Sequence, residues 1–188
     1  MAHALLKPVS EDEYLAAESA RTIKHEFVHG KVYAMAGASA NHNRIAGNLY
    51  GAVLAGAGTA CQPFIIDMRL RIDAGDLYYY PDVMLVCDAA DNDAYFKTAP
   101  CMVAEVLSPA TEAIDRREKL LAYQRLPSMR EYILIAQDRM HVEIFHRVNL
   151  REWGLTILGA DDTLSLRCAP VTLPMRDLYR GADFSQVA

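Results

Sequence analysis

Residues 77–86 read LYYYPDVMLV and residues 102–107 read MVAEVL. Both stretches are rich in aromatic and β-branched side chains, which is typical of strands buried in a sheet. Each stretch carries one acid, Asp82 in the first and Glu105 in the second. An isolated carboxylate in apolar surroundings is costly unless it is neutralised or meets a cation. We therefore expect two neighbouring strands whose acids do more than pack.

The two acids have two possible roles. Carboxylates on adjacent strands repel each other by about 4 kcal/mol at a separation of about 4 Å and an effective dielectric constant near 20. A divalent cation between Asp82 and Glu105 would remove that repulsion. Alternatively, each acid pairs separately with an arginine or caps a loop. The two strand patterns alone leave both interpretations open.

A helix is predicted over residues 112–126, directly after the second acidic strand. One stripe of this helix, at the spacing i, i+4, i+7, i+11, carries Glu112, Arg116, Lys119 and Tyr123. A helix that packs back across the sheet would bring Lys119 towards both carboxylates. A lysine on the solvated face of the helix is the simpler alternative.

The remaining segments alternate between helical and extended patterns. Ser10 and Glu13 form a capping-box pattern at the start of a predicted helix over 10–20. Gly47 and Gly51 interrupt a second predicted helix over 39–57, and we expect close backbone packing there because each glycine lowers helix propensity. The other predicted elements are a hairpin over 24–37, strands over 64–72, 131–136 and 141–148, and short edge strands beyond them. This order predicts an α/β fold around a mixed sheet.

Composition places the chain among ordinary globular proteins. It has 188 residues, of which 52% are hydrophobic, and a formal net charge of −5. We expect one domain over 1–188 with its core at about 10–180, and no membrane partner, because no apolar run approaches the roughly 20 residues needed to span a bilayer. The N-terminal residues lack the pattern of a signal peptide, so we expect a cytoplasmic protein. The scattered residues Cys61, Cys87, Cys101 and Cys168 are expected to be free thiols.

Several of these segments together resemble a known family. The similar stretches are Pro81-Asp82, AEVLSPAT at 104–111, DRREK at 115–119 with Tyr123, HEFVHGKVYAMAGASANHNRIAGNL at 25–49, FIIDMRLRI at 64–72 and EYILIAQD at 131–138. In their order along the chain they resemble a bacterial family of restriction-endonuclease-like proteins within the PD-(D/E)XK nuclease superfamily. The similarity spans residues 10–180, nearly the whole chain.

The resemblance implies a fold and a metal site. The implied fold is a restriction-endonuclease-like mixed β-sheet flanked by helices, in which Asp82 and Glu105 bind Mg²⁺ or Mn²⁺ and Glu26 adds a third acidic ligand. In one respect the chain departs from the superfamily pattern: Leu107 occupies the usual lysine position, two residues after the second acid. The role of that lysine would pass to Lys119 on the following helix. The implied catalytic residues are therefore Asp82, Glu105 and Lys119.

The resemblance also implies a substrate. A nuclease of this kind hydrolyses phosphodiester bonds of nucleic acid, with DNA as the expected form. Candidate substrate-binding residues are His42, Arg69, Arg116 and Tyr123. A homodimer would suit the cutting of both strands of a duplex. The alternative is an inactive member that binds nucleic acid or a protein partner, which the missing strand lysine and the acidic composition favour.

One motif points to a different chemistry. Residues 25–29, HEFVH, match the H-E-x-x-H pattern of zinc peptidases. That chemistry requires both histidines on one face of a helix, whereas this stretch continues into a predicted turn at His29-Gly30. We therefore expect a hairpin and no peptidase site.

Overall fold

The computed structural model describes residues 8–35 and 37–186, and both acidic strands contribute to its largest sheet. The six strands of this sheet are β3 (Gln62–Ile65), β6 (Val83–Val86), β8 (Pro100–Leu107), β9 (Glu131–Ala136), β10 (Val142–Arg147) and β11 (Trp153–Leu158). Their spatial order is β11-β10-β9-β8-β6-β3. Strand β8 runs antiparallel to β6 and parallel to β9, so the sheet is mixed, as expected.

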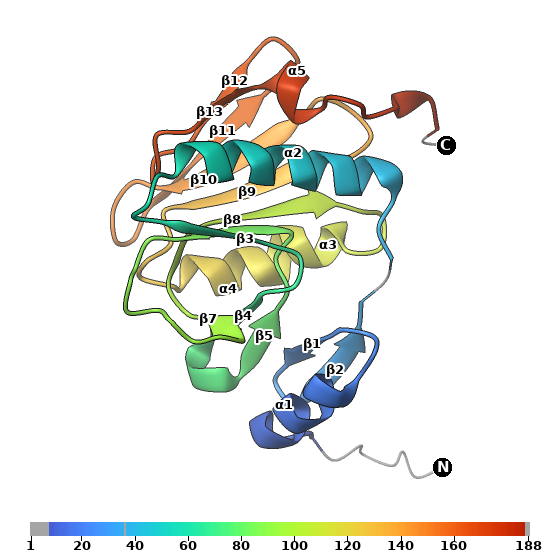
Figure 1. Cartoon of the computed structure of the whole chain (residues 1–188), viewed down its shortest axis with the longest axis vertical. Helices are drawn as coiled ribbons and strands as arrows, with labels where there is room; N and C mark the ends of the chain where they lie inside the picture. The colour runs from blue at the N-terminus through green and yellow to red at the C-terminus, as the bar shows by residue number, and fades with distance from the viewer. Residues whose placement is uncertain (1–7, 36, 187–188) are drawn as a thin grey trace.

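Helices cover both faces of the six-stranded sheet (Figure 1). On one face, α2 (Ala40–Gly56) packs its buried residues Ile45, Leu49 and Val53 against the sheet. On the other face, α4 (Leu120–Gln124) contributes Ala122 and Tyr123 to a second apolar cluster. All eight residues of β8 are buried. This double coverage explains why the central strands read as continuous apolar runs.

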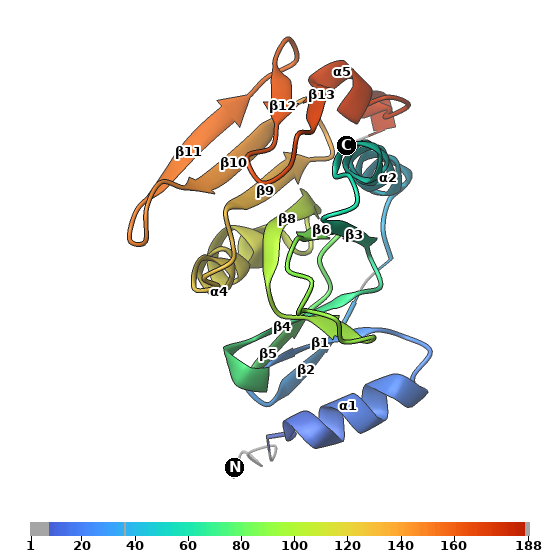
Figure 2. The ribbon, with the colours of Figure 1, turned by 60° about the vertical axis from the view of Figure 1, so that its left-hand side comes forward.

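A second sheet lies at the N-terminal end of the molecule (Figure 2). Its strand order is β2-β1-β5-β4-β7, and α1 (Glu11–Ala20) lies against it. Tyr14 of α1 packs on Phe27 and Tyr78 of this sheet. The strand bounds are β1 (His25–Val28), β2 (Lys31–Ala34), β4 (Arg69–Ile72), β5 (Leu77–Tyr79) and β7 (Phe96–Lys97). A 3₁₀ turn, η1 (Asp73–Gly75), joins β4 to β5.

Residues 64–72 and residues 77–86 were each predicted to form one continuous strand, and both predictions were wrong. Each stretch breaks in the middle and its two halves pair in different sheets. Ile66 adopts a φ of 60°, which ends β3 before β4 begins. Pro81 has no N–H to donate, and it lies between β5 and β6. A hydrogen bond connects the two positions at which the strands break: the Ile66 N–H donates to the carbonyl of Asp82 at 3.1 Å.

The predicted N-terminal elements are confirmed. Ser10 caps α1, its side chain accepts from the Glu13 N–H at 3.2 Å, and the Glu13 carboxylate accepts from the Ser10 N–H at 2.8 Å. The hairpin of β1 and β2 turns at His29 and Gly30, both of which have positive φ. The residues of the zinc-peptidase motif therefore lie on a strand and a turn, as expected, and not on a helix.

The helix predicted over 112–126 forms, but it is not regular. It consists of α3 (Glu112–Ile114), a π-helical segment η2 (Asp115–Lys119) and α4. The π-helical segment widens one turn, and it buries both Asp115 and Lys119. π-Turns occur often at functional sites, and this one carries the lysine that sequence analysis singled out.

The C-terminal residues cover the α2 side of the large sheet. They form a two-stranded sheet, a short helix and a 3₁₀ turn: β12 (Thr163–Ser165), β13 (Thr172–Pro174), α5 (Met175–Leu178) and η3 (Phe184–Gln186). Leu164, Leu173 and Leu178 join the same apolar cluster as α2. No helix within residues 8–35 and 37–186 has the length and apolar character to cross a membrane. Residues 1–7, which enter the expectation of no signal peptide, lie outside the described residues.

The expectation of four free thiols was wrong for one pair. Cys61 and Cys87 form a disulfide, whereas Cys101 and Cys168 are free. The antiparallel pairing of β3 with β6 explains the bond, because Gln62 lies opposite Val86 and the next residue on each strand is a cysteine. A separation of 26 residues in the sequence gave no indication of this pairing.

The expectation of close packing at Gly47 and Gly51 was also wrong. A Cβ atom placed on either residue would meet no heavy atom within 4 Å among the described residues. Both glycines are on the exposed face of α2. Gly56, near the end of the same helix, is different, because a Cβ there would lie 2.8 Å from Cγ2 of Val171.

We expect Gly47→Ala and Gly51→Ala each to raise the free energy of unfolding by about 1 kcal/mol, since alanine has the higher helix propensity and there is space for its methyl group. Urea unfolding followed by circular dichroism measures this change. Gly56→Ala is the matched control, and steric contact with Val171 should cancel its gain. An equal gain at all three positions, or none at the first two, would contradict this interpretation.

Candidate active site

One buried ammonium group lies among three carboxylates. Lys119 Nζ is 3.0 Å from Glu26 Oε1, 3.2 Å from Glu105 Oε1 and 3.1 Å from Asp115 Oδ1. Lys119, Glu105 and Asp115 are each less than 5% exposed. We call these four residues the Lys119 cluster. The cluster joins both sheets, because Glu26 comes from β1 and Glu105 from β8.

Strand alternation explains why Glu105 faces the helix. Val103 and Leu107, two residues before and two residues after it on β8, belong to the apolar cluster of α4, whereas Ala104 and Val106 belong to that of α2. Glu105 therefore points towards α4 and the π-helical segment. The sequence-based expectation that the helix would bring Lys119 to Glu105 agrees with this geometry.

Burial and charge set the protonation of the cluster. Burial raises the pKa of Glu105 well above its usual value, and the nearby Asp115, Asp82 and Glu26 add to that effect while Lys119 opposes it. Burial by itself would lower the pKa of Lys119, but Glu105, Glu26 and Asp115 raise it on balance. Lys119 therefore keeps its proton at neutral pH. In this form it can orient a water molecule or stabilise negative charge.

Aromatic side chains from α4 and β5 contact the cluster. The Tyr123 hydroxyl donates to Glu105 Oε1 at 2.9 Å, and Tyr123 is fully buried. Lys119 Nζ also lies 5.4 Å from the centre of the Tyr79 ring. Sequence analysis proposed Tyr123 as a substrate contact. Its position in the structure, with the hydroxyl on Glu105, is that of a residue that orients the acid.

Asp82 lies beside the cluster and is held separately. It immediately precedes β6, and since Val83 pairs with Ala104, Asp82 stands opposite Glu105 at the end of the ladder. Asp82 Oδ2 accepts from the Val106 N–H at 2.7 Å and lies 3.1 Å from His42 Nε2. His42 is in the first turn of α2, where Ser39 caps the helix and accepts the His42 N–H.

The other ring nitrogen of His42 offers a free contact. His42 Nδ1 is buried and has no hydrogen-bond partner within the described part of the chain. A buried polar atom without a partner is costly and commonly marks a position for water or ligand. His42 therefore has one ring nitrogen on Asp82 and the other without a hydrogen-bond partner among the described residues.

The donor set of this site fits a hard divalent cation. Carboxylate oxygens are the ligands that Mg²⁺ prefers, and Asp82 and Glu26 are both close enough to Glu105 to raise its pKa. In the part of the chain that the structure describes, no three His, Cys, Asp or Glu side chains are already arranged to hold a metal ion. Lys119 Nζ lies between the carboxylates instead. A metal would therefore have to take over the contacts of Glu105 and Glu26 with Lys119.

The two candidate arginines have other partners. Arg69 Nε donates to the carbonyl of Tyr95 at 3.2 Å, in the N-terminal sheet. Arg116 bonds to Glu112 at 2.7 Å and to Glu143 at 2.8 Å, and these carboxylates raise its pKa above the usual value. Among the described residues, the contacts of both guanidinium groups lie outside the Lys119 cluster.

Sequence analysis did not single out Asp115 as a site residue. Asp115 was noted only as the first residue of the DRREK stretch. The available signal was its spacing of i, i+4 to Lys119, which places an acid and a lysine side by side on a helix. Its burial could not be anticipated, because it depends on the π-helical segment.

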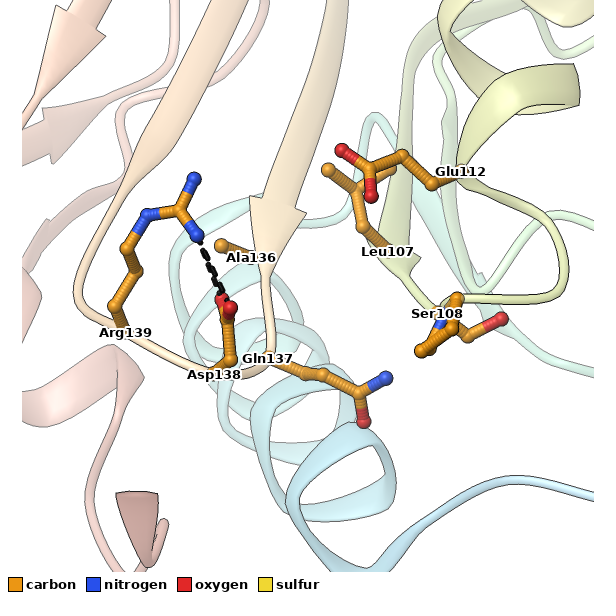
Figure 3. A pocket seen from close by; sticks show the side chains of 8 residues that line it. Leu107, Ser108, Glu112, Ala136, Gln137, Asp138 and Arg139 are labelled. Carbon is orange, nitrogen blue, oxygen red and sulfur yellow. Dashed lines mark hydrogen bonds and ion pairs between the residues drawn. The ribbon is translucent and has the colours of Figure 1, made fainter. Parts of the chain in front are cut away.

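A pocket opens next to the site at the ends of β8 and β9 (Figure 3). Leu107 lines this pocket, and its side chain lies on the same face of β8 as that of Glu105. Its lining residues are Leu107, Ser108, Pro109, Glu112, Ala136, Gln137, Asp138 and Arg139. Arg139 is folded onto Asp138, to which it donates at 3.0 Å (Figure 3), whereas the Gln137 side chain accepts from Ser39 at the start of α2.

One solved structure shares this architecture, and two other proteins are similar in sequence. A crystal structure titled as a putative nuclease belonging to DUF820, from Anabaena variabilis, superimposes with a TM-score of 0.73 at 17% identity, covering 92% of this chain and 98% of that one. Two proteins of Synechocystis sp. are similar in sequence. Uncharacterized protein sll1609 is 38% identical over 86% of this chain and 94% of its own, and uncharacterized protein slr1290 is 33% identical over 94% of both.

The family model described as "Putative restriction endonuclease", Uma2, matches residues 11–176. This match confirms the resemblance on which the expected fold rests, and the superposition confirms the nuclease-like mixed α/β architecture. The chain belongs to the Uma2 family of restriction-endonuclease-like proteins.

Proposed function

We propose that this protein is a metal-dependent endonuclease that hydrolyses phosphodiester bonds of DNA. The observation that supports this proposal is the Lys119 cluster, in which Lys119 contacts Glu105 and Glu26 beside Asp82. Acids on adjacent strands could hold a metal ion that activates water, and a buried lysine could stabilise the charge that develops on the phosphate. Family membership supports a nuclease, and the metal and the DNA substrate are our inference.

Each residue has a proposed task. Asp82, Glu105 and Glu26 would hold Mg²⁺ or Mn²⁺, which when bound polarises a phosphoryl oxygen and lowers the pKa of water. Lys119 keeps its proton and stabilises the negative charge that develops on the phosphate. His42 holds Asp82 through Nε2 and can accept a hydrogen bond from a water molecule at Nδ1, while Tyr123 fixes the orientation of Glu105.

The neighbouring pocket would receive the nucleic-acid chain next to the scissile phosphate. It adjoins Glu105 along β8 and offers the Ser108 hydroxyl and the Gln137 amide as polar groups. Arg139, the one arginine that lines the pocket, is paired with Asp138, so the pocket carries little free positive charge. We therefore expect this pocket to bind phosphate groups weakly. A second copy of the chain, in a homodimer, would help to position a duplex.

The second candidate function is an inactive member that binds nucleic acid or protein. The observation that favours it is Leu107, which leaves the strand without the usual lysine, together with the direct contacts of Lys119 with Glu26, Glu105 and Asp115. In such a protein the lysine would serve as a permanent counter-ion, and no metal would bind.

Cleavage of supercoiled plasmid tests the catalytic proposal. We expect the wild type to nick plasmid with Mg²⁺ or Mn²⁺ and not with EDTA, and Asp82→Asn or Lys119→Met to lower the rate by about 10²-fold or more. Lys31→Met, which removes an exposed lysine from β2, is the matched control and should leave the rate unchanged. Nicking that persists in EDTA, or is equal in Asp82→Asn, would contradict the proposal.

Thermal unfolding separates the two candidate functions without relying on activity. A cation that binds only the folded state raises the midpoint of unfolding by mass action. We expect millimolar Mn²⁺ to raise the midpoint of the wild type and to have no effect on the double variant Asp82→Asn/Glu105→Gln. An identical response of both proteins would favour the inactive binding protein.

A further inference from the structure

Four cysteines from distant parts of the sequence lie together at the end of β6 that is opposite to Asp82. Cys61 precedes β3, Cys87 follows β6, Cys101 is in β8, and Cys168 is in the loop between β12 and β13. All four belong to, or pack against, the same apolar cluster. None of them takes part in the Lys119 cluster, so whatever they do is separate from the proposed hydrolysis.

One free thiol contacts the disulfide directly. Cys61 and Cys87 are bonded, and Cys101 Sγ lies 3.4 Å from Cys87 Sγ. A separation of about 3–3.5 Å is that of reacting atoms in a near-attack arrangement. The contact arises from an irregularity in the sheet. Leu85 pairs with Met102 and Val86 with Pro100, so Cys101 has no partner in β6.

The surroundings of Cys101 favour its thiolate. A hydrogen bond from Cys168 lowers the pKa of the Cys101 thiol below its usual value, against the effect of burial. Cys168 itself is held by Glu131, whose carboxylate accepts from the backbone N–H groups of Arg167 at 2.7 Å and Cys168 at 3.2 Å. Because the thiolate is the nucleophile in disulfide exchange, this chain of contacts prepares Cys101 to attack.

We propose that these four cysteines form an intramolecular thiol–disulfide exchange site. The Cys101 thiolate attacks Cys87 Sγ, the Cys87–Cys101 bond forms as the Cys61–Cys87 bond breaks, and Cys61 leaves as a thiolate. The proton that Cys101 loses passes to solvent, and Cys61 takes one from solvent. The number of disulfides and thiols is unchanged, so the step consumes no oxidant or reductant.

The exchange moves a thiol from the core to the edge of the sheet. Cys101 is buried, whereas Cys61 is partly exposed and precedes β3, the edge strand. Cys61 thereby becomes a modification site for small thiol-reactive molecules, and it is open to them only after exchange. Cys168 supports the attacking thiolate and does not change partner.

Alkylation of the full-length protein, purified without reductant, tests this site. Iodoacetamide is added under native conditions, the protein is digested at acid pH to prevent scrambling, and linked peptides are identified by mass spectrometry. We expect Cys61 to be alkylated while the Cys87–Cys101 peptide accumulates in step. In Cys101→Ser, alkylation of Cys61 should be at least tenfold slower. Cys168→Ala removes the hydrogen bond that supports the Cys101 thiolate, so the Cys87–Cys101 peptide should still form in this variant but more slowly than in the wild type.

Three results would overturn the proposal. The first is the absence of the Cys87–Cys101 peptide from the alkylated wild type. This measurement uses no variant, so it does not depend on whether a variant folds. The second is equal alkylation of Cys61 in the wild type and in a folded Cys101→Ser, as judged by circular dichroism. The third is immediate alkylation of all four cysteines, which would mean that the disulfide does not form. Plasmid cleavage has no bearing on any of these outcomes.

Discussion

The buried ammonium group of Lys119 is the interaction on which this structure depends. It is the cation shared by Glu26 of one sheet, Glu105 of the other and Asp115 of the helix between them. Removing one partner from a buried ion pair typically costs about 3–5 kcal/mol, because a charge is then left without compensation. The same contact that joins the two sheets also gathers the acids of the site. Without a metal ion, Lys119 neutralises the carboxylates and stabilises the fold. A metal ion that bound to the same carboxylates would have to displace Lys119 from them.

The second constraint is the joint between the two sheets. The chain crosses from one sheet to the other at Ile66 and again at Pro81, and the two crossings are tied by the hydrogen bond from Ile66 to Asp82. Asp82 is therefore not inside a strand. It immediately precedes β6 of the large sheet, where its carboxylate contacts both the Val106 N–H and His42. Its position at this joint leaves the Asp82 side chain 14% exposed, whereas the Glu105 side chain is 5% exposed.

The sequence predicted the mixed α/β fold and several of its elements. The strand and helix patterns left the role of Lys119 open, whereas the family resemblance linked it to Glu105, and the two side chains do lie in contact. The capping box at Ser10 and the hairpin turn at His29 are local features, and they formed as expected. Features that depend on pairing between distant segments were not predictable. The break at Ile66 and the disulfide follow from strand register, and the burial of Asp115 follows from a π-helical turn that no residue pattern announces.

Unfolding in urea tests most directly whether Lys119 holds the sheets together. The comparison is between wild type, Lys119→Met, Glu105→Gln and the double variant, which forms a double-mutant cycle. The account predicts that Lys119→Met lowers the free energy of unfolding by about 3–5 kcal/mol. It also predicts that adding Glu105→Gln recovers part of this loss, since one uncompensated carboxylate is then removed. A Lys119→Met protein within about 0.5 kcal/mol of the wild type, with no coupling between the two positions, would contradict the account.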